Sequence, residues 1–173
     1  MLPACRSNDN DFENLIGKSI KSGTMRNVHE VIGYSDLIIK KDTTTKNLAN
    51  ETEAIVYFTA VIKNFKSVLE CIAEVKSISQ SGKYLIMEKL QTNIPSDFRP
   101  DGMMPVEISD NKLENFGITS NDKIKCLDYA LLSDDHKPEE ISGKVRPANL
   151  PIDQDIDQMK QYTTSINNIM DGL

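Results

Sequence analysis

The sequence that decides the fold is ISDNKLEN at residues 108–115, followed by CLDYA at residues 126–130. The first segment places Asp110, Lys112 and Asn115 in the spacing D-x-K-x-x-N. The second carries Asp128, an aspartate that leaves a predicted apolar strand 13 positions after Asn115. An isolated Asp or Asn in a turn usually caps the backbone beside it. Four polar residues in two closely spaced segments instead predict one shared site.

The composition is that of one folded domain. The chain has 173 residues, of which 39% are hydrophobic and 27% are charged. A chain of this length forms a substantial core without disulfides or a structural metal. Its formal net charge is −6, so the composition does not indicate a basic binding surface. Because nucleic-acid phosphates are bound by clustered Lys and Arg, the composition disfavours nucleic acid as the principal partner.

The cysteines and the apolar runs predict a cytoplasmic protein. Cys5, Cys71 and Cys126 are odd in number and have no neighbour at metal-ligand or redox spacing, so we expect reduced thiols. No apolar run approaches the roughly 20 residues of a spanning helix, and the first residues lack the apolar stretch of a signal peptide. We therefore expect no membrane span, and any export from the cell would proceed without a cleaved signal peptide.

The first part of the chain predicts antiparallel strands. Residues 1–13 are polar without periodicity and are expected to be a loose segment. Residues 15–41 alternate apolar patches with turn residues at Gly23 and at positions 33–36, as two or three antiparallel strands would. Residues 37–40, Leu-Ile-Ile-Lys, form a buried strand that ends at a lysine.

A helix is predicted at residues 48–65. Its apolar face is expected to contain Ile55, Phe58, Ile62 and Phe65, at spacings of three and four. Glu51 lies on the same stripe, whereas Glu53 lies on a flank nearer water. A lone glutamate on an apolar stripe costs roughly several kcal/mol unless it is paired, which favours a cationic partner for Glu51. The alternative is that Glu51 only stabilises the helix dipole.

The remainder predicts two hairpins between irregular segments. Strands are expected at residues 72–79 and 84–88, and again at 116–118 and 123–127. Residues 91–104 and 133–150 are interrupted by Pro and Gly and are expected to be loops. After Pro151, spaced apolar residues predict an amphipathic helix from residue 152 to about 171.

The segment at residues 108–115 resembles the catalytic loop of protein kinases, and the interval to Asp128 resembles that before the kinase D-F-G motif. Phosphoryl transfer requires a carboxylate that orients and deprotonates the attacking hydroxyl, and oxygen ligands for magnesium on the phosphates. The resemblance implies that Asp110 is catalytic, with Lys112 near the transferred phosphate as in Ser/Thr-directed kinases. It implies that Asn115 and Asp128 bind the metal. ATP and Mg²⁺ are the implied cofactors.

The strands before this loop resemble the nucleotide-binding half of a kinase. Residues 20–28 look like a degenerate glycine-rich loop that keeps its central Gly23, with Lys21 and Arg26 as flanking cations. Residues 37–40 resemble the V-A-I-K strand, whose lysine binds the α and β phosphates. The motif favours Lys40, although strand periodicity does not separate it from Lys41. Glu51 would be its carboxylate partner.

Residues 84–90, YLIMEKL, resemble the fifth strand and hinge of kinases. The resemblance implies that Met87 lies beside the adenine. It also implies that the backbone of Glu88 to Leu90 hydrogen-bonds the base. An ordinary buried strand is the alternative for this segment taken alone.

The resemblance covers about residues 15–131 and implies an α+β, protein-kinase-like fold. A five-stranded antiparallel N-lobe sheet with one helix is expected at residues 14–90. A strongly reduced C-lobe with a terminal helix is expected at 91–173. Leu90 and Asp110 are only 20 positions apart, too close for the helix that normally supports the catalytic loop, and Ala130 replaces the glycine of D-F-G. This reduction resembles the minimal atypical kinases that pathogenic bacteria inject into host cells as virulence effectors.

Two functions follow from the resemblance. The first is a serine/threonine protein kinase acting on a partner protein, including a host protein. The second is a pseudokinase or nucleotide-binding scaffold. Retention of five polar motif residues favours the kinase, and the missing support helix favours the scaffold. A third interpretation is a small α+β domain whose motifs coincide by chance, in which mutating these residues would not change nucleotide binding.

Overall fold

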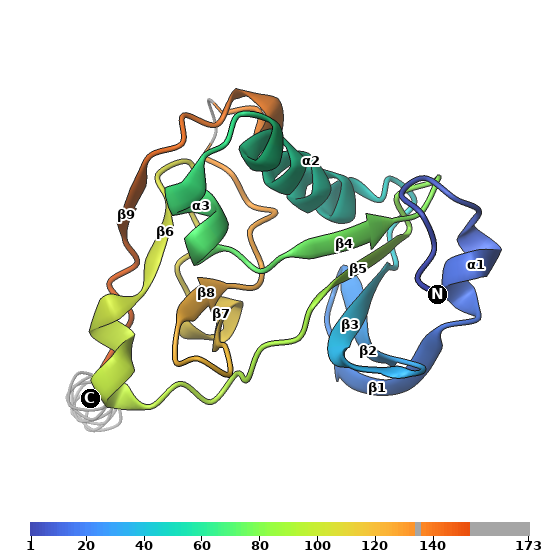
Figure 1. Ribbon diagram of the computed structural model, residues 1–173, viewed down its shortest axis with the longest axis horizontal. Coiled ribbons are helices and arrows are strands. Elements are labelled where there is room, and N and C mark those ends of the chain that lie inside the picture. Colours follow the sequence, from blue (N-terminus) through green and yellow to red (C-terminus); the bar gives the residue numbers. More distant parts are fainter. Residues whose placement is uncertain (134–135, 153–173) are drawn as a thin grey trace, which may run out of the picture.

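The computed structural model describes residues 1–133 and 136–152 and shows an α+β protein with few helices (Figure 1). In the first half the elements are α1 (Asp9–Glu13), β1 (Ile16–Ser22), β2 (Arg26–Val31), β3 (Tyr34–Asp42), α2 (Leu48–Ile62), α3 (Lys66–Cys71), β4 (Val75–Ile78) and β5 (Tyr84–Glu88). In the second half they are the 3₁₀ helix η1 (Ser96–Asp101), β6 (Met103–Pro105), η2 (Leu113–Asn115), β7 (Phe116–Ile118), β8 (Ile124–Cys126), η3 (Pro138–Glu140) and β9 (Val145–Pro147).

The five-stranded antiparallel sheet expected for residues 14–90 is confirmed. Its strand order is β1-β2-β3-β5-β4, and each neighbouring pair is antiparallel. Gly33 and Gly82 provide the turns before β3 and before β5, with φ angles of 84° and 77° that favour glycine. Strand β3 lies in the middle, so its run Leu37 to Lys40 is buried on both faces.

The two faces of the sheet carry separate apolar clusters (Figure 1). Helix α2 covers the face that carries Ile38 and Met87. Helix α1 covers the opposite face, where Phe12 is fully buried and stacks on Tyr84 with ring centroids 6.4 Å apart. The expectation of a loose segment at residues 1–13 is therefore wrong. Periodicity missed it because contacts distant in sequence hold the segment in addition to this one buried aromatic ring. The NH of Arg6 donates to the C=O of Ile78 at 2.7 Å, and the Ser81 hydroxyl donates to Asp9 Oδ2 at 2.6 Å.

Helix α2 buries a different face from the predicted one. Its buried residues are Asn50, Glu53, Ala54, Val56 and Ala60, whereas Ile62 is 83% exposed. Small alanine side chains allow the helix to approach the sheet closely, so the large apolar residues do not mark the packed side. The helix also ends at Ile62 rather than Phe65, because Asn64 adopts a left-handed φ of 55°.

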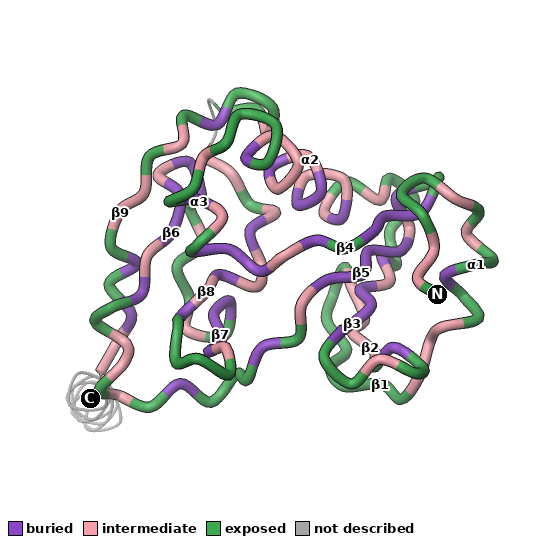
Figure 2. The backbone as a smooth tube through the Cα atoms, viewed as in Figure 1, coloured by how far each residue is buried: buried purple, intermediate pink, exposed green. Residues whose placement is uncertain are grey.

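The second half consists of short strands around the remaining core. The predicted hairpin forms as β7 and β8, and the NH of Ala73 donates to the C=O of Cys126 at 2.8 Å, which fastens β8 beside the chain that enters β4. Buried residues gather along β5, β4 and the inward side of α2 (Figure 2). The loop expected at residues 133–150 contains β9, which pairs with β6. The predicted terminal helix lies, from residue 153 onward, outside the described residues.

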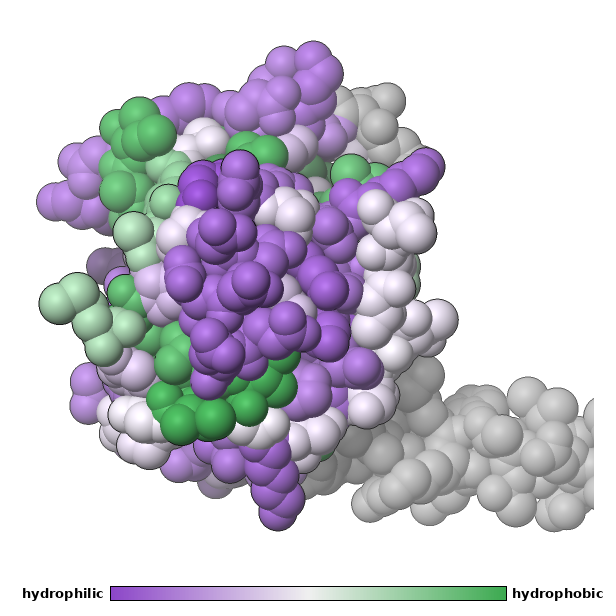
Figure 3. Space-filling view, turned by 90° about the vertical axis from the view of Figure 1, so that its right-hand side faces the viewer, coloured by the Kyte–Doolittle hydropathy of each residue, from purple (hydrophilic) through white to green (hydrophobic). Residues whose placement is uncertain are grey.

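The face at the α1 end of the molecule is mainly hydrophilic and carries separate hydrophobic patches (Figure 3). Within residues 1–133 and 136–152, no helix combines the length and the apolar composition needed to cross a membrane. The three thiols are free, with Cys5 exposed and with Cys71 and Cys126 buried, as expected.

Candidate functional site

A cluster of four charged side chains joins the two halves of the molecule. Lys40 and Glu53 are buried, while the side chains of Arg26 and Asp128 are 9% and 39% exposed. Lys40 Nζ lies 2.9 Å from Glu53 Oε1 and 3.0 Å from Oε2. Arg26 Nη1 lies 2.9 Å from Glu53 Oε2, close enough for an ion pair although its N–H is not aligned for a hydrogen bond. Arg26 Nη2 donates to Asp128 Oδ1. Two cations and two carboxylates from four separate segments therefore meet at one point.

The strand register places both cations on one face of the sheet. Arg26 lies opposite Asp42, and Val28 lies opposite Lys40, so these residues share the face toward α2. Lys40 is 2% exposed on that face. Lys41 points to the opposite face, with its Nζ 5.9 Å from the centroid of Tyr84. Of the two lysines, it is therefore Lys40 whose side chain faces α2 and the cavity.

Glu53, and not Glu51, is the carboxylate partner of Lys40. The Glu53 side chain is fully buried, whereas Glu51 forms an ion pair with Arg6 at 2.6 Å near the surface. The prediction for Glu51 is wrong because it relied on the large apolar residues to define the packed side of the helix. The buried face contains Asn50, Glu53, Ala54 and Ala60, which are small or polar, so hydrophobic periodicity does not mark it.

The segment that carries Asp128 is fastened to this cluster through its backbone. Lys40 Nζ donates to the C=O of Leu127 at 2.6 Å. The NH of Tyr129 donates to Glu53 Oε1 at 3.1 Å. The positions of the lysine, the glutamate and the aspartate are therefore interdependent.

The loop at residues 108–115 reaches the same point. The C=O of Asn115 accepts the NH groups of Leu127 at 2.8 Å and Asp128 at 3.3 Å. Asn115 Nδ2 donates to the C=O of Asp110 at 3.4 Å. Lys112 Nζ lies 3.3 Å from Asp110 Oδ2, and its side chain is 67% exposed. The structure therefore brings Asp110, Asn115 and Asp128 together.

Asp110, Asn115 and Asp128 line a cavity of about 700 Å³. Its lining also includes Lys40. Gly23 and Arg26 both line the cavity, so the turn between β1 and β2 forms one wall. The NH of Gly23 closes this turn by donating to the C=O of Arg26 at 2.9 Å. Three exposed apolar side chains, Met25, Leu48 and Leu131, also line it. The cavity thus combines buried charges with a partly apolar boundary.

The predicted adenine-binding segment lies apart from this cavity. None of Met87, Glu88 and Leu90 is among its lining residues. Met87 is fully buried in the core under α2. The NH of Glu88 donates to the C=O of Glu74 at 2.8 Å, and the NH of Lys89 donates to the C=O of Asp36 at 2.9 Å. Strand pairing therefore already uses two of the amides in this segment.

The surroundings shift the pKa values of the clustered groups. Burial raises the pKa of Asp128, but the charges of Lys40 and Arg26 outweigh it, so that the pKa falls to about 2. Burial lowers the pKa of Arg26, but the charges of Glu53 and Asp128 outweigh it and raise that pKa. Burial also lowers the pKa of Lys40, an effect that the charge of Glu53 opposes. Asp128 and Arg26 are therefore charged at neutral pH.

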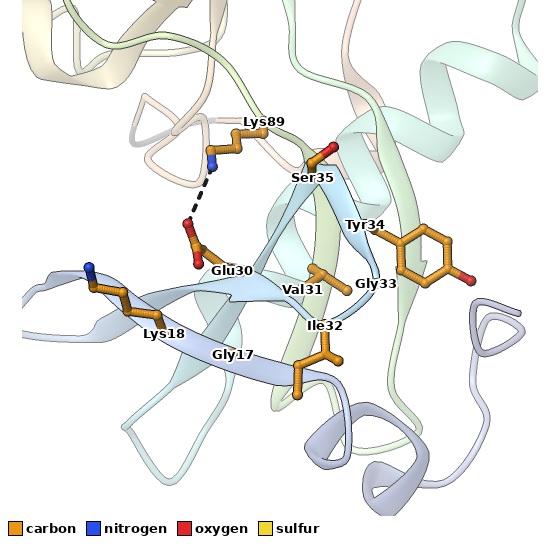
Figure 4. A pocket seen from close by; sticks show the side chains of 9 residues that line it. All are labelled: Gly17, Lys18, Glu30, Val31, Ile32, Gly33, Tyr34, Ser35 and Lys89. Carbon is orange, nitrogen blue, oxygen red and sulfur yellow. Dashed lines mark ion pairs between the residues drawn. The ribbon is translucent and has the colours of Figure 1, made fainter.

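A second hollow, of about 540 Å³, lies at the other end of β1 and β2 (Figure 4). Glu30 and Lys89 point toward each other there, with Nζ and Oε1 3.7 Å apart, while Lys18 extends alongside from β1. Tyr34 points away to the opposite side of the sheet. This hollow contains neither the cluster of four charged side chains nor the loop at residues 108–115.

Comparison with known proteins found no family model that matches this chain and no curated protein that matches it. The site therefore has to be interpreted from its own geometry.

Three features of the site were not predicted from the sequence. Glu53 was assigned to the wrong side of the helix, and Arg26 was expected only as a cation flanking Gly23. Asn50, fully buried, donates from Nδ2 to the C=O groups of Gly82 and Lys83, both at 3.0 Å, and of Lys40 at 3.3 Å. Asn50 thereby holds α2 against the end of β3. Nothing in the local sequence distinguishes it from an exposed asparagine.

Proposed function

We propose that this protein is a minimal, kinase-like enzyme that transfers the γ-phosphate of ATP to Ser or Thr hydroxyls of a partner protein. The observation that carries the proposal is the cluster of Arg26, Lys40, Glu53 and Asp128 beside a cavity that Asp110 and Asn115 also line. Phosphoryl transfer depends mainly on positioned charges.

Stability alone is a poor reason for such a cluster. Removing charged groups from water costs several kcal/mol per ion, and well-packed apolar residues often stabilise the same position better. Here Lys40 and Glu53 are both almost completely buried, and two backbone contacts hold the Asp128 segment against them. Perturbed charges that converge on a cavity favour a functional site.

The residues fit magnesium bound to a nucleotide. Among the described residues, no group of three or more His, Cys, Asp or Glu is placed to hold a metal by itself. Mg²⁺ on a nucleotide takes only one or two carboxylates and completes its shell with phosphates and water. Asp128 already accepts a cation at Oδ1, and Asn115 uses its Nδ2 toward Asp110, which leaves its amide oxygen as a ligand. When bound, the metal would neutralise charge on the phosphates.

The roles of Lys40 and Asp110 follow from position. Lys40 and the turn at Gly23 form the part of the cavity suited to phosphates, because they provide an ammonium group and exposed backbone. Asp110 is half-buried and adjacent to Asn115, so it is placed to orient a hydroxyl and accept its proton. Lys112 pairs with Asp110 at 3.3 Å but is not among the residues that line the cavity. Its proposed role near the transferred phosphate therefore rests on the resemblance to Ser/Thr-directed kinases.

A nucleotide-binding scaffold is the second candidate, and two contacts favour it. Arg26 occupies Oδ1 of Asp128, an oxygen that a metal would need. The amides of Glu88 and Lys89 already donate to carbonyl groups of the protein. Cytoplasmic action, secretion into a host cell and the identity of the partner protein are also part of the proposal, because they rest on the resemblance to effector kinases.

The test is transfer of labelled γ-phosphate from Mg-ATP to the protein itself and to proteins of a cell lysate. We expect labelling by the native chain and losses of at least about 100-fold in Asp110→Asn and Asp128→Asn. Asp122→Asn is the matched control, because Asp122 is exposed in the β7–β8 turn and its φ of 58° also suits Asn.

ATP binding without labelling by the native chain would favour the scaffold. No ATP binding by the native chain would contradict both candidates. Equal labelling by Asp110→Asn, Asp128→Asn and Asp122→Asn would contradict the assigned roles.

A further inference from the structure

Asp42 has a buried carboxylate oxygen without a partner. The residue is 2% exposed at the end of β3. Its Oδ1 accepts the NH of Thr44 at 2.7 Å and the hydroxyl of Thr44 at 2.6 Å. Its Oδ2 is buried and has no hydrogen-bond partner among the described residues. Because an unsatisfied buried acceptor is costly, this oxygen requires an explanation.

Asp42 lines the same cavity as Asp128 and is the direct cross-strand neighbour of Arg26. Directly opposed residues on one face of an antiparallel pair have Cβ atoms about 4.5–5.5 Å apart. The long side chain of Arg26 can therefore reach Asp42 by rotation about its own bonds. In the described arrangement it turns instead toward Glu53 and Asp128.

We propose that Arg26 is a positioning residue that moves from Asp128 to Asp42 when a magnesium nucleotide binds. This inference rests on the proposed function. A magnesium ion bound to the Asp128 carboxylate would place two positive charges beside the guanidinium group of Arg26, and this repulsion favours the departure of Arg26. A buried guanidinium needs another anion to replace the one it loses. Asp42 Oδ2 is a carboxylate oxygen in the same cavity that lacks a donor.

The balance of charge supports the exchange. Arg26 and Lys40 are the buried cations of the cluster, while Asp42, Glu53 and Asp128 are its carboxylates. In the described arrangement the carboxylate of Asp42 has no cationic partner. Transfer of Arg26 to Asp42 leaves Glu53 with Lys40 and frees Asp128 for a divalent cation. Every carboxylate then has a positive partner.

The backbone around Arg26 is held in place, so the exchange is confined to the side chain. The NH of Thr43 donates to the C=O of Met25 at 2.8 Å, and the Thr43 hydroxyl donates to the same oxygen at 2.9 Å. Gly23 closes the turn on the other side by donating to the C=O of Arg26. The turn therefore stays fixed while the guanidinium group changes partner.

A double-mutant cycle on Mg-ATP affinity tests the exchange, with titration calorimetry as the measurement. Asp42→Asn keeps the Oδ1 acceptor for Thr44 but removes the charge that would receive Arg26. We expect it to weaken Mg-ATP binding by about tenfold, the size of one charge-assisted hydrogen bond. In an Arg26→Gln background the same change should have no effect, because no guanidinium group needs a new partner. Asp36→Asn, an exposed position on the same strand, is the control.

An equal effect of Asp42→Asn with and without Arg26 would overturn the inference and leave the proposed function intact. Absence of Mg-ATP binding by the native chain would overturn the proposed function, and the inference with it. A second measurement follows the ¹⁵N resonances of the Arg26 side chain in labelled protein. Addition of Mg-ATP should shift them in the native chain and in Asp36→Asn, and a shift of the same size and direction in Asp42→Asn would contradict the exchange.

Discussion

Glu51 and Glu53 lie two positions apart on α2, and each pairs with a cation, yet their surroundings are opposite. Glu53 is fully buried against Lys40 and Arg26, whereas the Glu51 side chain is 26% exposed and pairs with Arg6, which is 49% exposed. Water screens the pair of Glu51 with Arg6, whereas the charges around Glu53 are almost unscreened. The comparison shows that the position of a carboxylate around the helix decides whether it becomes part of a buried site or forms only a surface ion pair.

The largest effect is expected when the buried carboxylate loses its charge. Glu53→Gln leaves Lys40 and Arg26 in the core without full compensation, and removing one partner of a buried pair costs about 3–5 kcal/mol. We expect a loss of this size in the free energy of unfolding, measured by urea denaturation. A loss below about 1 kcal/mol would mean that water reaches the cluster.

Asn50 tests the buried side of the helix without changing a charge. Asn50→Ala removes donors to three carbonyl groups near Lys40 and should cost about 1–3 kcal/mol in the free energy of unfolding. Asn121→Ala, at an exposed position in the β7–β8 turn, is the matched control and should cost less than about 0.5 kcal/mol. Similar losses in both variants would contradict the role assigned to Asn50.

Lowering the pH should weaken the cluster, because Asp128 becomes protonated and loses its charge. Its pKa of about 2 in the folded protein is below the ordinary value of 3.8, so its contribution to stability is present above about pH 4 and is lost as the pH falls toward 2. The native chain should therefore lose part of its stability advantage over Asp128→Asn between pH 5 and pH 3, and most of the remainder by pH 2. Urea denaturation at these three pH values measures the difference, and an unchanged gap would contradict the lowered pKa.

The smallest effect is expected at the surface pair. Glu51→Gln should change the free energy of unfolding by about 0–1 kcal/mol, because exposed ion pairs contribute little. Added salt should reduce even this difference. A loss comparable to that of Glu53→Gln would show that the pair with Arg6 supports the helix as strongly as the buried pair does.

Local sequence signals predicted the strands well. Alternating apolar residues and the turns at Gly33 and Gly82 were sufficient for the hairpins, because hairpins form between segments adjacent in the chain. The β3–β5 pairing that joins them into one five-stranded sheet was expected only from the kinase resemblance. The local signals also located the β7–β8 hairpin and the buried run at residues 37–40, although β3 continues past the predicted end at Lys40 to Asp42. These features depend on side-chain alternation and turn chemistry, which are visible within a few residues.

The packed side of α2 was not visible locally. Ile62 and Phe58 suggested one face, but the helix buries Glu53 and Ala54, because the sheet requires a close approach and Lys40 requires a counter-charge. The N-terminal helix was missed for a related reason, since it is held by the buried ring of Phe12 and by hydrogen bonds to residues 78–84, far away in the sequence. In both helices, the residues that become buried depend on which part of the sheet packs against the helix.

The sequence by itself determined the strands, their hairpin turns and the segments that carry Asp110, Asn115 and Asp128. Only the tertiary structure decided that Glu53 pairs with Lys40, that Arg26 reaches Asp128 across 102 positions, and that Asp42 keeps an unpaired oxygen. The physical reason is that hydrogen-bonded strands follow from local alternation, whereas buried charges are paired by whatever group the fold brings within reach in the absence of water.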